Sequence, residues 1–423
     1  MKTVKSKGKF DYTWVIVALS FLMVFISLGF CSSNKSLYLT AITGALGIKR
    51  SLFSLGDSIR FISTAVINIF FGTLVKKFGT KKLICTGLFL LILSCFLRTI
   101  AENIWVFYLD HLFLGLGFSW TSTTMVGCVI NRWCKENKGT IMGAVMASNG
   151  LGGALAAQIV TPIIYNPNNP FGYRTAYKIV IAVLAVTLIL FLFFFKDKPK
   201  GATEEVVVTK KKSRGRSWIG IPFGEVLKTP YFYGAAVCIF FTGFTLQGIS
   251  GIKIPHYTDM GIDSAALASI ISVASLSLTA FKFATGFIYD KLGLRTTVLI
   301  CNFAAIFTCF GLFFVNKETV PLAFVISVFS SLSLPLETIM LPIYTGDLFG
   351  QRAYDHLLGV FVSINVFGYA VGSPVFNLCY DIFGNYKPAF ILGGTVMAVT
   401  NIGLMFVISA AHKKRKEIEN ETK

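Results

Sequence analysis

Lys282 is the residue of this chain whose position is least expected for its chemistry. It lies inside the apolar run from Ala265 to Thr297, eight residues before the acidic Asp290. If that run is a membrane-spanning helix that ends at Asp290, Lys282 lies about 12 Å deep, close to the middle of a bilayer. A lysine there is costly unless it faces protein, a water-filled cavity or an anion, so Lys282 is a candidate for binding an anionic group. The alternative is that its long side chain bends the charge back to the nearer interface.

Two further candidates follow from charges in the first apolar runs. Asp57 and Arg60 are three residues apart, so a helix places them on one face, with Arg60 near the middle of the membrane. They form either a self-neutralised pair that stabilises packing or, in Arg60, a second cation that faces an anion. Lys35 follows Ser32-Ser33-Asn34 near the outer end of the first run, and it either faces the same anion or extends outward.

Glu337 is the candidate for coupling substrate movement to a proton. It stands between Pro335 and Pro342 and ten residues before Asp347, roughly 15 Å deep. A lone carboxylate at that depth needs a cation or a proton. If Glu337 pairs with Lys282, a proton and a substrate anion can compete or cooperate across the pair; the alternative is a permanent structural salt bridge. A weaker candidate is Asp110-His111, interpreted as an interior hydrogen-bonded pair.

These residues must be positioned by membrane-spanning helices. Of the 423 residues 54% are hydrophobic and 14% are charged, with mean hydropathy +0.69, whereas a soluble domain has about 25% charged residues. Hydropathy predicts twelve spans, which start near Trp14, Ser51, Lys82, Ile104, Gly139, Arg174, Tyr231, Ser264, Arg295, Thr319, Leu357 and Pro388. The net charge of +19 comes from short segments between these runs, so no nucleic-acid partner is expected.

The basic residues predict the topology. Most of the 39 lie in alternate connections and at the two ends, which indicates a multi-pass protein of the plasma (inner) membrane with both termini in the cytoplasm. Arg98 and Lys253 are assigned to outer helix ends. The longest connection is basic and divides the chain into an N-terminal bundle (1–195), a linker (196–228) and a C-terminal bundle (229–423).

An internal repeat supports this division. Four residues of one connection recur 214 residues later in similar form: Gly72, Lys77, Gly79 and Lys81 stand opposite Gly286, Lys291, Gly293 and Arg295. We therefore expect an all-α membrane protein in which twelve transmembrane helices form two pseudo-symmetric six-helix bundles around a central cavity.

The second copy of this segment resembles the loop signature of the major facilitator superfamily, which is a glycine, an acid four residues later, a basic residue and a second glycine. The matching residues are Gly286, Asp290, Lys291 and Gly293. The resemblance implies that these residues, with Gly72 and Gly79, form gating loops. The first copy has Lys76 where the family usually has an aspartate, which weakens a charge relay on that side.

Further motifs resemble the monocarboxylate porter and oxalate:formate antiporter group of bacterial type. They are Asn131-Arg132-Trp133, Lys138-Gly139-Thr140-Ile141-Met142-Gly143, Gly172-Tyr173-Arg174, Asp347-Leu348-Phe349-Gly350 and Tyr380-Asp381-Ile382-Phe383-Gly384. The group moves small organic anions by alternating access, and the resemblance implies that Lys282, four residues before Gly286, holds the carboxylate. Where oxalate antiporters carry a second lysine this chain has Asn365, which favours a monoanion. Leu278 replaces the aspartate of monocarboxylate porters, which leaves Glu337 as the coupling group.

The expected function is secondary active transport of a small organic anion, a monocarboxylate, with proton symport or exchange for another anion. The expected residues are Lys282, Arg60, Lys35 and Asn365 for binding and Glu337 and Asp57 for coupling. Two rivals stay open: a carrier of neutral or amphipathic molecules, favoured by 41 Phe and 15 Tyr, and a membrane sensor that does not transport. Walker glycines, an HExxH pair and a nucleophile triad are absent, so we expect no enzyme activity, cofactor or metal. We also expect a monomer.

Overall fold

The computed structural model describes residues 12–134, 138–197, 220–350 and 352–421. Within these ranges the chain is helical and contains no strand, as predicted. The helices of the first half are α1 (Thr13–Val24), a π-helical segment (Phe25–Phe30), α2 (Lys35–Leu46), α3 (Arg50–Ile69), α4 (Phe71–Phe78), α5 (Thr80–Ile100), α6 (Ile104–Thr121), α7 (Thr123–Trp133), α8 (Lys138–Ile164) and α9 (Gly172–Phe194).

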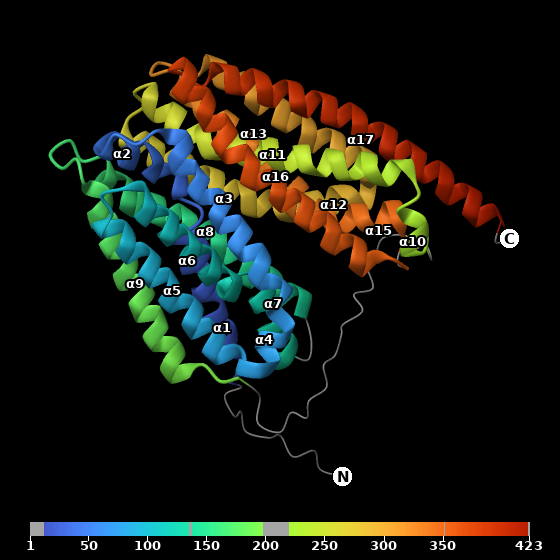
Figure 1. Cartoon of the computed structure of the whole chain (residues 1–423), viewed down its shortest axis with the longest axis horizontal. Coiled ribbons are helices and arrows are strands. Elements are labelled where there is room, and N and C mark those ends of the chain that lie inside the picture. The colour runs from blue at the N-terminus through green and yellow to red at the C-terminus, as the bar shows by residue number, and fades with distance from the viewer. Residues whose placement is uncertain (1–11, 135–137, 198–219, 351, 422–423) are drawn as a thin grey trace, which may run out of the picture.

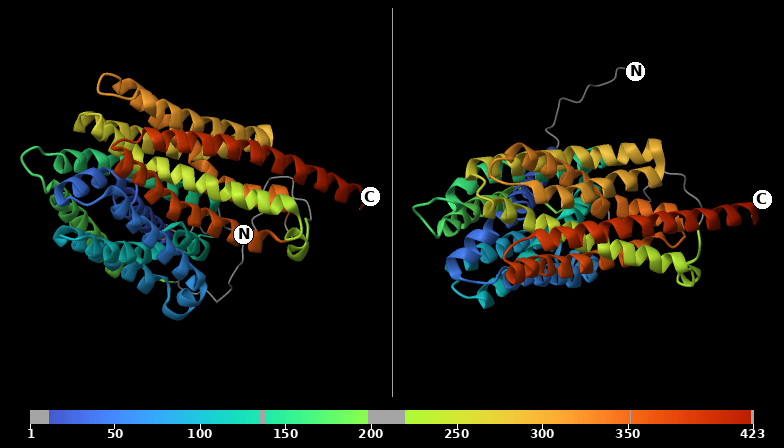
Figure 2. Two further views of the ribbon diagram at one scale, coloured as in Figure 1. Left: turned by 45° about the horizontal axis from the view of Figure 1, so that its top comes forward. Right: turned by 90° about the horizontal axis from the view of Figure 1, so that it is seen from above.

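The second half begins with the one-turn helix α10. Its helices are α10 (Phe223–Val226), α11 (Pro230–Asp259), α12 (Ser264–Gly311), α13 (Val320–Ser333), α14 (Pro335–Thr338), α15 (Met340–Phe349), α16 (Tyr354–Phe383) and α17 (Lys387–Glu421). The last of these, α17, extends well beyond the ends of its neighbours (Figure 2).

Ten described segments are long and apolar enough to cross a membrane. One of them, Ser264–Phe314, makes two crossings because Gly293 breaks the helix with φ 80° and ψ 176°. The consecutive helices α3 and α4 carry the charged Asp57 and Arg60 and form the remaining crossing of the twelve that hydropathy predicts. Each predicted start lies within about three residues of a helix start, since turns and charges interrupt the apolar runs at those points.

The repeat is visible in the backbone. Gly47 and Gly261, 214 residues apart, both have positive φ (64° and 75°) and end the first helical crossing of their half. Gly79 and Gly293, at the same separation, share φ 80° with ψ 162° and 176° and follow the second crossing. Such angles are open to glycine and strained for other residues. The two halves therefore turn in the same way at corresponding points.

The two halves form separate helix groups that lie together at one end and diverge towards the end that carries α4 and α10 (Figure 1). We call the end where α1 begins and α17 ends the terminal side, and the opposite end the far side. The hydrogen bonds and ion pairs that join the groups in the described residues all lie in the far half. They join α3 to α16, to α11 and to Tyr386, α8 to α12, and Tyr165, just after α8, to Thr258 of α11. The structure is thus held closed at the far side.

Candidate functional site

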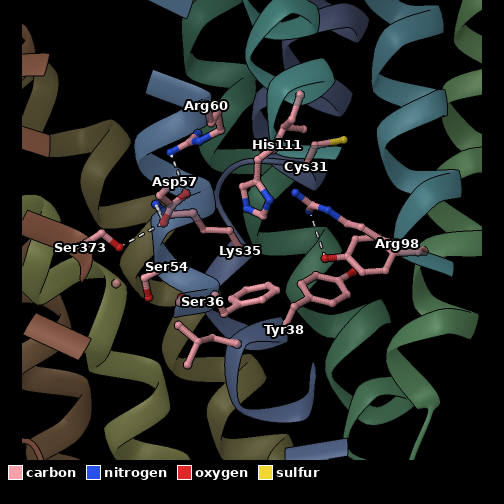
Figure 3. A pocket seen from close by; sticks show the side chains of 15 residues that line it. Cys31, Lys35, Ser36, Tyr38, Ser54, Asp57, Arg60, Arg98, His111 and Ser373 are labelled. Carbon is pink, nitrogen blue, oxygen red and sulfur yellow. Dashed lines mark hydrogen bonds and ion pairs between the residues drawn. The ribbon is translucent and has the colours of Figure 1, made fainter. Parts of the chain in front are cut away.

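Asp57 is the centre of a buried charge cluster. Its carboxylate accepts from Lys35 Nζ at 3.0 Å and lies 3.3 Å from the Arg60 guanidinium. Ser373, from α16 in the second group, donates its hydroxyl to the same carboxylate at 3.2 Å (Figure 3). The predicted pairing of Asp57 with Arg60 is therefore present, but the carboxylate serves two cations at once. This leaves the cluster with an excess of one positive charge.

Part of the Arg60 guanidinium is free to bind a ligand or a water molecule. It lies ten residues into α3, about 15 Å from the far end, and it is only 6% exposed. Its face lies 4.2 Å from the centre of the Phe61 ring, while its buried Nε has no hydrogen-bond partner. An unsatisfied donor of a buried cation is unfavourable unless a ligand or water completes it.

A cavity of about 260 Å³ separates the two groups beside this cluster. It is lined by Ser32, Ser33, Lys35, Ser36, Arg60 and Phe61 from the first half and by Gln247, Ser250, Lys253, Ile254, Ile270, Ile271, Ala274, Ser275, Leu278, Ser327, Ser331 and Leu334 from the second. Three of these residues are cations and none is acidic. A cavity with this lining attracts an anion, since it presents three positive charges away from bulk water, where they are screened poorly.

Lys253 is the cation that sequence reasoning assigned to the wrong place. It was expected at an outer helix end, but α11 continues six residues beyond it, to Asp259, and buries it to 8% exposure. Its ammonium group donates to Ser330 Oγ at 3.1 Å and has no carboxylate within 4 Å in the described part of the chain. The polar spacing Gln247, Ser250, Lys253 on one helix face was the signal that could have identified it.

Lys282 adjoins this cavity without lining it. It lines a pocket of about 20 Å³ between α8 and α12, together with Asn149 and Thr279. That pocket shares Ser33, Ser275 and Leu278 with the larger cavity. Seven residues separate Ser275 from Lys282 on the same helix face, so Lys282 lies about 10 Å nearer the terminal side.

Glu337 is buried, as its depth predicted, but its neighbours differ from those expected. It is 9% exposed, its Oε1 has no hydrogen-bond partner, and it interacts with Tyr369 of α16 and electrostatically with Lys35. No ion pair joins it to Lys282 among the described residues, which corrects the expected pairing. Only Leu334, which keeps helical angles (φ −61°, ψ −27°), separates α13 from α14, the short helix that carries Glu337.

A second buried cluster continues from Asp57 into the first half. Arg98 donates to Asp110 at 2.7 Å and to the Tyr177 hydroxyl at 3.1 Å, and His111 lies 3.3 Å from the same carboxylate. The predicted hydrogen bond between Asp110 and His111 is absent: the His111 Nδ1 bonds to the Phe107 carbonyl at 2.7 Å, and the nearby Asp110 Oδ2 has no hydrogen-bond partner among the described residues. Arg98 lies in the last turn of α5, at the outer helix end where it was expected, but it is only 5% exposed. A cavity of about 30 Å³, roughly the share of one water in the liquid, lies between this cluster and Asp57 (Figure 3).

Comparison with known proteins decides the family. The family model of the Major Facilitator Superfamily matches residues 17–316 and again residues 235–423. The chain belongs to the major facilitator superfamily. Members of this superfamily are membrane transporters of small molecules and not enzymes.

Among curated members of the superfamily, the sialic acid transporter NanX of Escherichia coli (strain K12) is 24% identical over 280 residues, which cover 64% of this chain and 64% of that transporter. The match therefore spans less than two thirds of NanX. Monocarboxylate transporter 13 of Rattus norvegicus is 23% identical over 327 residues, 77% of this chain and 72% of its own.

Solved superfamily structures share the fold. The nucleoside transporter NupG superposes with a TM-score of 0.73 at 14% identity, covering 94% of this chain and 99% of that one. A bacterial homologue of the human lysosomal transporter Spinster, solved in an inward-facing conformation, gives 0.66 at 13% identity, with 96% and 95% covered.

The superfamily loop residues lie on the terminal side. Gly72 lies in α4 and Gly286 in α12, while Asp290 and Lys291 are exposed at the end of the α12 crossing. In the first half Asp197 supplies a carboxylate at this loop, because it accepts from the Thr80 hydroxyl at 2.5 Å and from the Lys81 backbone at 2.7 Å.

Asn365 lies apart from the cavity. It is 2% exposed, and its side-chain amide donates to the Ile239 carbonyl of α11 at 3.1 Å. Gly243 allows this close crossing, since a Cβ there would stand 2.7 Å from the amide nitrogen of Asn365. The structure places Asn365 at a helix contact in the second half, which corrects its expected position beside the substrate.

Proposed function

We propose that this protein is a secondary transporter that carries a small organic anion across the membrane by alternating access. The observation that supports the proposal is the convergence of Lys35, Arg60 and Lys253 on one inter-bundle cavity whose lining includes no acidic residue, with Asp57 paired to the first two. Two bundles each contribute cations, so a bound anion would attract both. An anion is the ligand that this arrangement favours most.

Lys253 is the proposed anchor of the substrate carboxylate. Its charge has no acidic partner in the described residues, whereas Lys35 and Arg60 already share Asp57. Arg60, with its unsatisfied Nε, would supply the second contact from the opposite bundle. Lys282 would hold the anion on its way to the terminal side, since its small pocket adjoins the cavity.

The topology completes the proposal. The terminal side carries most of the basic residues and would be cytoplasmic, in the plasma (inner) membrane. The conformation described here would then be open inwards and closed outwards. Charge balance would come from a co-transported proton, with Glu337 as its carrier, or from exchange for a second anion.

The relatives agree with an acidic substrate. The names of NanX and monocarboxylate transporter 13 say that they carry an acid, a sialic acid in the first case and monocarboxylates in the second. NupG carries nucleosides, and this likeness concerns the fold alone. A monocarboxylate in the broad sense, a molecule with one carboxylate, is the proposed substrate class.

The test is anion binding to the purified full chain, with Lys253→Gln, Lys282→Gln and the exposed Lys178→Gln as a matched control. Loss of a charge-assisted contact of about 1.5–3 kcal/mol weakens binding by roughly 10- to 100-fold. We expect this loss in Lys253→Gln, a smaller loss in Lys282→Gln and none in Lys178→Gln. Anion binding that is equal in all four proteins would refute the proposal.

The two rival functions predict different results. A carrier of neutral molecules, which the apolar lining residues Phe61, Ile270 and Leu334 would suit, binds its ligand regardless of both lysine changes. A sensor binds the anion but does not move it. Uptake of a bound, labelled anion into proteoliposomes separates a transporter from a sensor.

A further inference from the structure

We infer that the transported anion is a polyhydroxylated carboxylate, such as a sugar acid, in preference to a short unsubstituted monocarboxylate. This inference rests on the proposed anion transport and narrows its substrate class. The observation that supports it is the set of uncharged polar side chains around the three cations.

Hydroxyl groups make up a large part of the cavity wall, beside seven apolar residues. Eight of its eighteen lining residues are uncharged and polar, and with the three cations they leave a minority of apolar residues. The eight are Ser32, Ser33, Ser36, Gln247, Ser250, Ser275, Ser327 and Ser331. A site for an alkyl carboxylate needs an apolar wall beside its cation, because the alkyl chain gains from leaving water only for apolar surroundings.

Most of these polar side chains are available to a ligand. Ser33 donates to Asn149 and to Leu28, and Ser327 and Ser331 bond to groups of the protein. The other five make no side-chain hydrogen bond with any described residue, and all five are half-buried at the cavity: Ser32, Ser36, Gln247, Ser250 and Ser275. Five unengaged donors and acceptors around one cavity suit a ligand with several hydroxyl groups of its own.

The polar groups extend from the cations in one direction. Gln247 and Ser250 precede Lys253 on α11 by six and three residues, which places Gln247 about 9 Å nearer the terminal side. Ser32 precedes Lys35 in the same sense on the first crossing of the other bundle. A ligand whose carboxylate meets Lys253 and Arg60 would therefore lay its remaining length along Gln247, Ser250 and Ser32.

This arrangement discriminates against an alkyl acid. Such a ligand would displace water from the five side chains and return no hydrogen bonds, and a site built to bond hydroxyl groups rejects the analogue that lacks them. A polyhydroxylated acid replaces those waters with matching groups. The discrimination should be at least about tenfold, since it involves several hydrogen bonds.

Three probes of similar length separate the contributions. Gluconate carries a carboxylate and hydroxyl groups, hexanoate only the carboxylate, and sorbitol only hydroxyl groups. Titration calorimetry on the purified full chain should give a Kd for gluconate at least about tenfold below that for hexanoate, and no binding of sorbitol at the same concentrations.

The variant Gln247→Leu/Ser250→Ala tests whether the named residues cause the preference. We expect it to bind hexanoate at least as tightly as the wild type does, because fewer polar groups lose their water, and to lose most of its preference for gluconate. The retained hexanoate binding shows that the variant is folded, and Ser36→Ala is a milder second variant. Ser363→Ala, at an exposed hydroxyl that donates to its own helix, should change nothing.

The failures are distinguishable. If hexanoate binds as tightly as gluconate and both need Lys253, the hydroxyl inference is wrong and the anion proposal stands. A preference for gluconate that survives the double variant also overturns the inference. If sorbitol binds as well as gluconate and Lys253→Gln has no effect, or if no probe binds the wild type, both the inference and the proposed function fail.

Discussion

Arg50 and Asp259 form a two-point ion pair that joins the two bundles at the far side. The guanidinium nitrogens lie 2.5 and 2.7 Å from the two carboxylate oxygens, between the first residue of α3 and the last residue of α11. Arg50 also stacks on the Tyr380 ring at 3.7 Å. Asp381 of the second bundle accepts the backbone N–H groups at the start of α3, at 3.1 and 2.8 Å. Asp381 of the second bundle thus caps the N-terminus of α3 in the first bundle.

Breaking this pair should open the far side. Arg50→Gln removes a partly buried, bidentate ion pair, and a loss of about 1–2 kcal/mol changes the ratio of closed to open molecules by 5- to 30-fold. Spin labels at Asn168 and Glu318 lie in far-side loops of the two bundles. The distance between them, measured by double electron–electron resonance, should increase. The charge-reversed double variant Arg50→Asp/Asp259→Arg should restore the shorter one. An unchanged distance in Arg50→Gln would show that the pair does not hold the closure.

Asp57→Asn should expose the cationic character of the cavity. The change leaves Lys35 and Arg60 without their shared carboxylate, and losing one partner of a buried charge group costs about 3–5 kcal/mol. The thermal unfolding midpoint should fall, and an added anion ligand should raise it by more than it does in the wild type. The variant Asp57→Asn/Arg60→Gln should recover part of the stability. Equal anion stabilisation in Asp57→Asn and wild type would contradict the assigned geometry.

Glu337→Gln should separate exchange from net transport. The change preserves the volume but removes the buried group that can carry a proton beside Tyr369 and Lys35. In proteoliposomes we expect counterflow exchange of the labelled anion to persist and uptake driven by a pH gradient to disappear. Glu318→Gln, in an exposed far-side loop, is the control. If uptake driven by the pH gradient survives in Glu337→Gln, another group carries the proton and Glu337 has a structural role.

The paired glycines should respond unequally to alanine. Gly79→Ala and Gly293→Ala both place a Cβ at φ 80°, with a cost of about 1–3 kcal/mol. At Gly79 the added carbon would also stand 2.9 Å from an Asp197 carboxylate oxygen, whereas at Gly293 it meets nothing within 4 Å. Gly79→Ala should therefore lower the unfolding midpoint more. Gly286→Ala, in regular helix with open space around it, should be neutral or slightly stabilising. Equal losses at Gly79 and Gly293 would mean that Asp197 moves aside without cost.

The helices and their repeat could be predicted because they depend on local patterns. Apolar runs of bilayer length, interrupted by charges and glycines, mark each crossing, and Gly79 and Gly293 stand at the same turn of each half. The Asp57 and Arg60 pair followed from helix periodicity alone. Each of these predictions depends on residues that are near one another in the sequence.

The site was predicted less well because its geometry depends on contacts between distant helices. Pro255 and His256 follow Lys253, and a proline and a polar residue are typical of the end of a span. In the structure α11 continues to Asp259, and Lys253 is therefore buried within the helix. The neighbours of Glu337 come from other helices, Tyr369 of α16 and Lys35 of the first crossing, and hydropathy locates these spans without placing one against another. Nothing in the first crossing alone indicates that Lys35 shares the carboxylate of Asp57.

The repeat of the backbone has a consequence for how this carrier evolved. The glycines that turn the chain recur at a spacing of 214 residues, but the charged cavity residues do not. Lys35, Arg60 and Lys253 stand opposite Ile249, Ala274 and Leu39. After duplication of an ancestral six-helix unit, both copies would have kept the glycines that turn the chain, and each copy would have acquired its own charges. A change of substrate can therefore come from substitutions in the cavity residues of one half, while the turn glycines of both halves stay as they are.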